Sequence, residues 1–148
     1  MERNFIDGYT EWQANPEIVG VNRLPQHATL MPYENFDEAK KADRYASSRC
    51  KLLNGKWKFK LYKNYAYKPS DFAQPHYDAH NWDSIIVPGS WQMQGYDQPQ
   101  YCNVRYPWEG SEDICPPNAP TKHNPVGCYL KKIHINAAAL QKRIVLCF

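Results

Sequence analysis

The sequence predicts an all-β fold, a jelly-roll β-sandwich that is present only in part. Short runs in which apolar and polar residues alternate favour strands, and irregular segments with 12 prolines and 7 glycines among 148 residues separate these runs. Strands that alternate with long helical patterns, which would indicate a parallel sheet, do not occur. Four or five strand-like runs are present where a jelly roll needs about eight. We therefore expect the sandwich to end before its last strands.

The first fifty residues are expected to form an extended arm with one short helix. Prolines interrupt this region at regular intervals, and each lacks the amide hydrogen that a helix interior needs. The short helix is predicted over 36–46, because Asn35 can cap it and acidic residues follow in its first turn. The domain boundaries are accordingly 1–50 for the arm and 51–148 for the incomplete jelly roll.

Four segments carry strand signals. In the segment 57–62 the residues Trp, Phe and Leu alternate with lysines, so one face of this strand should be buried. A second apolar run, 85–87, ends at a Pro–Gly pair that stops a strand. Two further runs, 129–135 and 143–148, flank a short link with three consecutive alanines. Strands therefore dominate this part of the chain.

The composition and the charge argue against several classes of partner. The formal net charge of +3 is spread along the chain without a long basic run, so nucleic-acid binding is not expected. The N-terminus is polar where a signal peptide needs an apolar core, and no window approaches the roughly 18 apolar residues of a membrane span. Five cysteines without a Cys-x-x-Cys pair favour free thiols in a cytoplasmic protein.

A zinc site has to be considered because Cys102, Cys115 and Cys128 recur every thirteen residues, with His123 and His134 nearby. Zinc sites usually take two ligands from a close pair, which this spacing lacks. Small buried thiols are the favoured interpretation. No metal ligand is assigned to the chain.

The segment 87–108 has the composition of a recognition loop. It mixes tryptophans and tyrosines with glutamine, asparagine and aspartate side chains, which suit the apolar faces and the hydroxyl edges of a sugar. Trp91 and Trp108 are candidates for positions near a ligand, although most aromatic residues of the chain must fill its core. Asp97 precedes Pro99 by two residues, where it can cap a turn or contact a ligand.

No pair of catalytic carboxylates can be assigned. Glu109, Glu112 and Asp113 are close in sequence, but their stretch is rich in Gly, Ser and Pro, which favours a solvated loop over the acid and nucleophile of a glycosidase. The chain also lacks a Gly-rich phosphate loop and a Gly-x-Ser-x-Gly elbow. These observations favour binding over catalysis by these residues.

Several motifs together resemble one family. LNGKWKF at 53–59, VPGSWQMQGYDQPQYCNVRYP at 87–107 and NPVGCY at 124–129 are similar to segments of the N-terminal domain of glycoside hydrolase family 2 β-galactosidases, in the same order. NPEIVGVNRLPQHA at 15–28 resembles the N-terminal arm of that family. The resemblance implies a galactose-binding-domain-like jelly roll. It also implies a parent enzyme that hydrolyses terminal non-reducing β-D-galactose residues in β-galactosides such as lactose.

The resemblance implies that substrate binding and catalysis are shared between two domains of that enzyme. In the family this domain reaches into the active site of a following barrel, which carries the two catalytic glutamates of a retaining mechanism. This chain would therefore supply a substrate-binding loop and be inactive alone. Asn103, in the YxNVxYP motif, is implied to contact the hydroxyls of the terminal galactose, for which an amide offers a donor and an acceptor. Asp97 and Trp91 are the next candidates for substrate contact.

Magnesium and sodium are implied for the parent enzyme, but not as ligands of this chain. The family's sodium-binding aspartate lies in a GxGQDSR-like motif that these 148 residues lack. Residues 11–16 resemble the family's magnesium segment, but one extra residue shifts the ligand spacing. The implied partners are the β-galactoside substrate, the remainder of the β-galactosidase polypeptide and further copies in a homo-oligomer. The alternatives are a free-standing carbohydrate-binding module and a structural docking domain.

Overall fold

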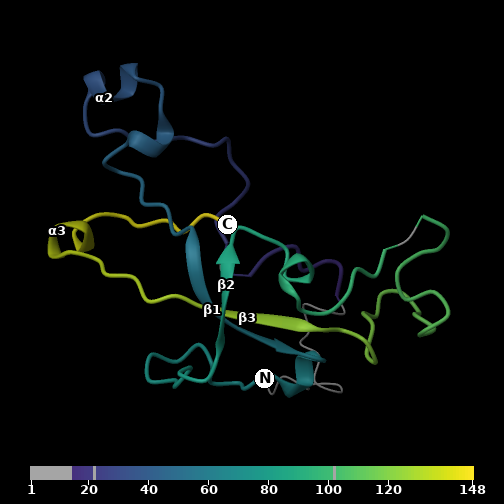
Figure 1. The fold of residues 1–148 in the computed structure, drawn as a ribbon. Coiled ribbons are helices and arrows are strands. Elements are labelled where there is room, and N and C mark those ends of the chain that lie inside the picture. The colour runs from purple at the N-terminus through teal and green to yellow at the C-terminus, as the bar shows by residue number, and fades with distance from the viewer. Residues whose placement is uncertain (1–14, 22, 102) are drawn as a thin grey trace, which may run out of the picture.

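The core of the molecule is a small antiparallel sheet with the strand order β2-β1-β3. A computed structural model describes residues 15–21, 23–101 and 103–148. Figure 1 shows the strands at the centre, with long irregular segments around them. The all-β prediction is confirmed, and a small sheet with few helices is consistent with part of a jelly roll. The strands are β1 (Gly55–Tyr62), β2 (Asp83–Val87) and β3 (Val126–Leu130).

β1 lies between the other two strands and has an apolar and a basic face. Because successive strand residues point to opposite faces, Trp57, Phe59 and Leu61 share one face and the lysines of β1 share the other. The predicted strands 57–62 and 85–87 are confirmed. The register runs from Gly55↔Val87 to Phe59↔Asp83 on the β2 side, and from Lys58↔Leu130 to Tyr62↔Val126 on the β3 side.

The apolar face of the sheet is centred on Phe59, which is 0% exposed. Its ring lies 4.7 Å from that of Tyr96, 4.8 Å from that of Tyr129 and 6.3 Å from that of Trp91, measured between centroids. Ile85 is buried beside it. Tilted and edge-on aromatic pairs of this kind add to the stabilisation that comes from burial alone. This cluster contains Phe59 and Ile85, the largest fully buried side chains among the described residues.

The opposite face carries a second aromatic cluster. Cys128 is buried there, and burial raises the pKa of its thiol, as expected for a small buried residue. The connection between β1 and β2 contributes the rings of Phe72 and Tyr77, which pack on the buried Trp82 at 6.2 and 5.6 Å. Lys58 donates a hydrogen bond of 2.8 Å from Nζ to the carbonyl oxygen of Trp82. The lysine face of β1 is therefore tied to this connection.

The predicted helix over 36–46 is wrong in its length. Helix α2 covers only Phe36–Lys40, although Asn35 caps it as expected and accepts a hydrogen bond of 2.8 Å from the Glu38 amide. The chain leaves the helix at Ala42, whose φ is +52°. Asp43 then caps a separate 3-10 turn through the Tyr45 amide. An aspartate that finds a local amide partner ends a helix in this way.

The strand predicted over 129–135 begins and ends earlier than expected, because β3 covers Val126–Leu130. Beyond Leu130 the pairing with β1 is replaced by a side chain. Lys131 donates from Nζ to the carbonyl oxygens of Asn54 and Lys56, at 3.3 and 3.4 Å. These acceptors are then no longer available to a continuing strand.

The predicted strand 143–148 is also wrong. This segment has no strand partner among the described residues, and its apolar side chains are exposed. A strand needs a neighbour to pair its backbone groups, so an apolar run alone does not form one.

The remaining helices are short. The preceding three-alanine link forms helix α3, which Asn136 caps by accepting from the Ala139 amide at 2.8 Å. Among the described residues no helix has the length and apolar character that crossing a membrane requires. These helices are α3 (Ala137–Leu140) and the 3-10 turns Arg44–Ala46, Tyr65–Tyr67 and Gln92–Gln94.

Candidate functional site

The candidate site lies in the long segment between β2 and β3, which extends away from the sheet in Figure 1. Asn103 is exposed in a turn of this segment. The neighbouring Val104 and Tyr106 are exposed to 89% and 83%, and Tyr101 is exposed as well. An amide flanked by apolar and aromatic surface can meet both the hydroxyls and the C–H face of a sugar.

Trp91 holds the first part of this segment on the sheet. The indole is half-buried, and its six-membered ring covers Gly127 of β3 so closely that a Cβ there would lie 2.7 Å from it. The ring also packs on Phe59. Its Nε1 is buried without a hydrogen-bond partner among the described residues. In this position Trp91 supports the loop from the core side.

Gln94 fixes the same part of the segment to the outer edge of β2. Its Oε1 accepts from the Ile86 amide at 2.8 Å, and its Nε2 donates to the Ile86 carbonyl oxygen at 3.0 Å. The side-chain amide thus takes both backbone groups that a neighbouring strand would take. Gln94 is a structural residue, although the sequence grouped it with amides suited to recognition.

Asp97 lies a few residues farther along, in an exposed position. Its φ is +57°, in the left-handed region that aspartate tolerates better than most residues. The prediction that it contacts substrate is not tested by this geometry. Its backbone conformation nonetheless gives a reason for an aspartate in this turn.

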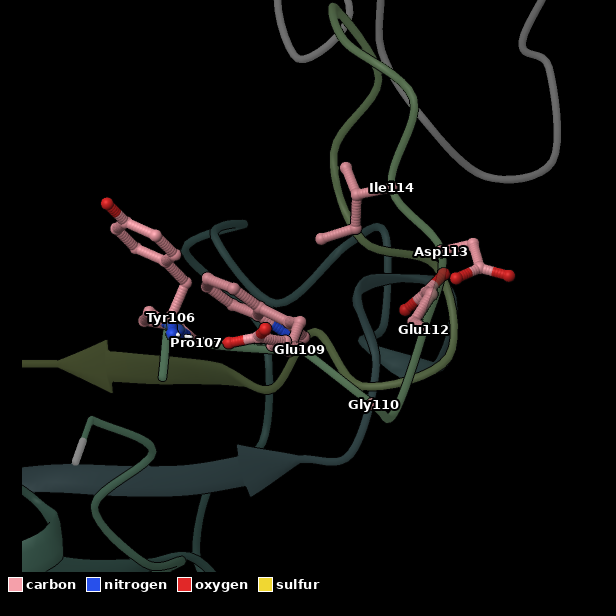
Figure 2. Close-up of a pocket in the computed structure, with 8 residues that line it drawn as sticks. Tyr106, Pro107, Glu109, Gly110, Glu112, Asp113 and Ile114 are labelled. Carbon is pink, nitrogen blue, oxygen red and sulfur yellow. Dashed lines mark hydrogen bonds between the residues drawn. The ribbon is translucent and has the colours of Figure 1, made fainter. Parts of the chain in front are cut away.

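A shallow hollow of about 390 Å³ lies beyond Asn103 and is lined by Tyr106, Pro107 and the residues from Trp108 to Ile114, except Ser111. Figure 2 shows Tyr106 on one side of this hollow and the acidic pair Glu112 and Asp113 on the other. None of Trp91, Asp97 and Asn103 lines it. The candidate sugar contacts and the hollow are therefore neighbouring, separate features of one loop.

Glu112 is the best-connected carboxylate of the loop. It accepts hydrogen bonds of 2.6 Å from both the amide and the hydroxyl of Thr121, and its two oxygens accept from the Lys122 amide at 3.1 and 3.0 Å. We call this group of contacts the Glu112 clamp. The prediction of a solvated loop around Glu112 is confirmed, and Glu112 closes this loop through Thr121 and Lys122.

The Glu112 clamp favours the charged carboxylate. The hydrogen bond from the Thr121 hydroxyl, helped by backbone amides, lowers the pKa of Glu112 from 4.5 to about 2. Hydrogen bonds that stabilise the charged form act in this direction. Because the pKa is lower in the folded than in the unfolded chain, the contribution to stability is complete above about pH 4.5 and is lost as the pH falls toward 2.

Trp108 closes the base of the loop next to the clamp. Its Nε1 donates to the His123 carbonyl oxygen at 2.7 Å, and its backbone takes a φ of +66°. Asn64, just after β1, donates to the Thr121 carbonyl oxygen and forms an isolated bridge with Asn124. The end of the loop is thus joined to the sheet immediately before β3. Trp108 therefore has a structural role, because it ties the end of the loop to His123.

The arrangement suits binding better than proton transfer. Glu109 accepts from the Tyr106 amide at 3.0 Å, and Glu112 is occupied by its clamp, so both carboxylates have structural partners. No group of three or more His, Cys, Asp or Glu residues that could hold a metal ion occurs in the part of the chain that the structure describes. Cys102 and residues 11–14, most of the segment that resembles the family's magnesium segment, lie outside the described residues.

Comparisons with known proteins agree with the sugar-binding interpretation. The family described as "Glycosyl hydrolases family 2, sugar binding domain" matches residues 50–148. Similar proteins include a β-galactosidase of Priestia megaterium, 50% identical over 125 residues, and one of Halalkalibacterium halodurans, 42% identical over 124 residues. Each alignment covers 84% of this chain and 12% of the relative. The β-galactosidase large subunit of Leuconostoc lactis is 36% identical over 150 residues, or 93% of this chain and 23% of the subunit.

Proposed function

We propose that this chain, which belongs to the sugar binding domain family of glycosyl hydrolases family 2, is the N-terminal part of a β-galactosidase and supplies a substrate-binding loop to its active site. The observation that carries the proposal is the exposed Asn103 turn, held between two segments that are anchored on the sheet. The relatives named β-galactosidase support the choice of galactosides as substrates.

Asn103 would recognise the sugar through its side-chain amide. One amide can donate to one hydroxyl and accept from another, which fixes the orientation of a terminal galactose. Apolar neighbours such as Val104 exclude water around such a contact. Asp97 is the second proposed contact, since it is exposed in the same segment. Trp91 is the third proposed contact and would meet the substrate from the side of the loop that faces the core.

Hydrolysis itself is proposed to depend on glutamates outside this chain. Retaining glycosidases need two carboxyl groups about 5–5.5 Å apart, one as general acid and the other as nucleophile. The loop carboxylates Glu109 and Glu112 are instead hydrogen-bonded to neighbouring residues of the loop. The substrates would be terminal non-reducing β-D-galactosides such as lactose. This chain alone would then bind its part of the substrate without cleaving it.

The proposal also names the partners of the chain. The remainder of the β-galactosidase polypeptide would cover the exposed surface around Asn103, and further copies would form a homo-oligomer through the arm. In the arm, Val19 and Leu30 are largely exposed and available for such a contact. Cysteines 50, 115, 128 and 147 are free thiols, which supports a reducing cytoplasmic location. Magnesium and sodium would bind to other parts of the enzyme.

Replacing Asn103 with alanine in the complete polypeptide should weaken galactoside recognition. We expect kcat/KM for a nitrophenyl galactoside to fall roughly tenfold, the effect of losing the hydrogen bonds of one amide. Stability should change by less than about 0.5 kcal/mol, because the residue is exposed. Steady-state kinetics and thermal unfolding of the same preparation measure both quantities.

Asn118→Ala is the matched control, since Asn118 is an exposed asparagine in the same connection between β2 and β3. It should leave kcat/KM unchanged. If Asn103→Ala also has no effect on kcat/KM, the assignment of Asn103 to the sugar site is wrong.

A further inference from the structure

The segment that carries Asn103 is suspended between two anchors. On its N-terminal side, Gln94 is bonded to β2 and Tyr96 packs edge-on against Phe59. On its C-terminal side, the Glu112 clamp and Trp108 join the loop to the residues just before β3. The position of an exposed turn depends on the anchors at its two ends.

A set of hydrogen bonds leads from Tyr106, three residues after Asn103, to the clamp. The Tyr106 amide donates to the Glu109 carboxylate at 3.0 Å, and the Glu109 amide donates to the Tyr106 carbonyl oxygen at 3.2 Å. The Trp108 carbonyl oxygen accepts from the Glu112 amide at 3.1 Å. Residues 106–112 therefore form consecutive turns, and a shift of Glu112 would move the segment that begins three residues after Asn103.

The clamp requires a carboxylate. All of its partners are donors: the backbone amides of Thr121, Lys122 and His123 and the hydroxyl of Thr121. A glutamine would keep one acceptor oxygen but would bring an N–H group toward donors, which leaves one amide unpaired. The lowered pKa of Glu112 has the same origin. A negatively charged carboxylate is therefore needed at this position because all of its partners are hydrogen-bond donors.

We propose that Glu112 is a positioning residue for sugar recognition: by holding Thr121 and Lys122, it fixes the loop segment that presents Asn103 to the galactoside. This inference rests on the proposed function of Asn103. Glu112 itself touches no substrate. Its effect on the reaction passes through the position of the Asn103 turn.

The test compares Glu112→Gln with Asp113→Asn in the complete polypeptide. Both substitutions remove one negative charge from the same loop, but exposed Asp113 has no hydrogen bond to any residue that the structure describes. Glu112→Gln should raise KM for a nitrophenyl galactoside roughly three- to tenfold with a smaller change in kcat, as expected when a binding group is misplaced. It should also speed deuterium exchange in peptides covering 103–123. Asp113→Asn should change neither quantity.

A double substitution distinguishes positioning from a separate effect. If Glu112 acts through Asn103, then Glu112→Gln should raise KM little further when Asn103 is already alanine. Thr121→Val removes only the hydroxyl of the clamp and should act in the same direction, which keeps the test open if Glu112→Gln fails to fold.

Three results would overturn the inference. Unchanged KM and exchange in Glu112→Gln would show that the clamp does not control the loop. Additive effects of the two substitutions would show that Glu112 acts independently of Asn103. An unaltered KM and kcat in Asn103→Ala alone would instead remove the proposed function on which the inference rests.

Discussion

Phe59→Ala is expected to cost about 3–5 kcal/mol of stability, the loss typical of a fully buried aromatic residue. Phe59 is the completely buried side chain at the centre of the sheet, and the rings of Trp91, Tyr96 and Tyr129 pack on it. Its removal leaves a cavity under all three rings and loosens the segment that leads to Asn103. Urea unfolding of the wild-type and the substituted protein measures the loss.

Phe36→Ala is the matched control for this prediction. Phe36 lies in α2 and is 74% exposed, so its removal should cost less than about 0.5 kcal/mol. Equal losses in the two variants would mean that the sheet cluster around Phe59 is not the core of the protein.

Gly127→Val is expected to destabilise the chain by about 3 kcal/mol, at the upper end of the cost of overpacking. A Cβ at Gly127 would lie 2.7 Å from the Trp91 ring and 2.8 Å from the Phe59 ring. The Trp91 indole would have to leave the sheet, so its fluorescence should shift to longer wavelength as water reaches it. Thermal unfolding and emission spectra test the two consequences.

Gly20→Val provides the control for Gly127→Val. A Cβ at Gly20 would meet only the side chain of Arg23, at an ordinary distance of 3.5 Å. The melting temperature and the emission maximum should therefore stay the same. A Gly127→Val protein with wild-type stability would contradict the close packing of Trp91 on β3.

The strands that pair with a neighbour could be predicted from the sequence. Alternation of aromatic and basic residues revealed β1, and the stop signal after residue 87 revealed the end of β2. The segment 143–148 has an equally apolar sequence but has no strand partner among the described residues. Pairing is a long-range property, so local periodicity cannot distinguish these cases.

Helix length was predicted less well, for a local reason. The Asn35 cap and the acidic first turn, which predicted a helix over 36–46, did not reveal that Ala42 takes a positive φ and that Asp43 caps its own turn. Aspartate competes with the helix for backbone amides, and the outcome depends on neighbouring contacts. One such contact is the hydrogen bond from the Ser47 hydroxyl to the Pro32 carbonyl oxygen.

A candidate site could be proposed from the sequence, but the structural roles of several of its residues could not be predicted. The mixture of amides and aromatics predicts recognition by the segment 87–108. Within it Gln94 bonds to Ile86, eight residues away, and just beyond it Glu112 bonds to Thr121, nine residues away. An amide that recognises a sugar and one that covers a strand edge are chemically identical. Only the spatial partners of Gln94 distinguish the two uses.

The most direct test of the account is a crystal structure of the complete polypeptide with bound galactose. The account predicts that the Asn103 side-chain amide lies within about 3.2 Å of a galactose hydroxyl, the distance of a hydrogen bond. The Glu112 clamp should be intact in the same structure. A bound galactose with no atom of Asn103 within about 5 Å, beyond the reach of a direct hydrogen bond, would contradict the central claim.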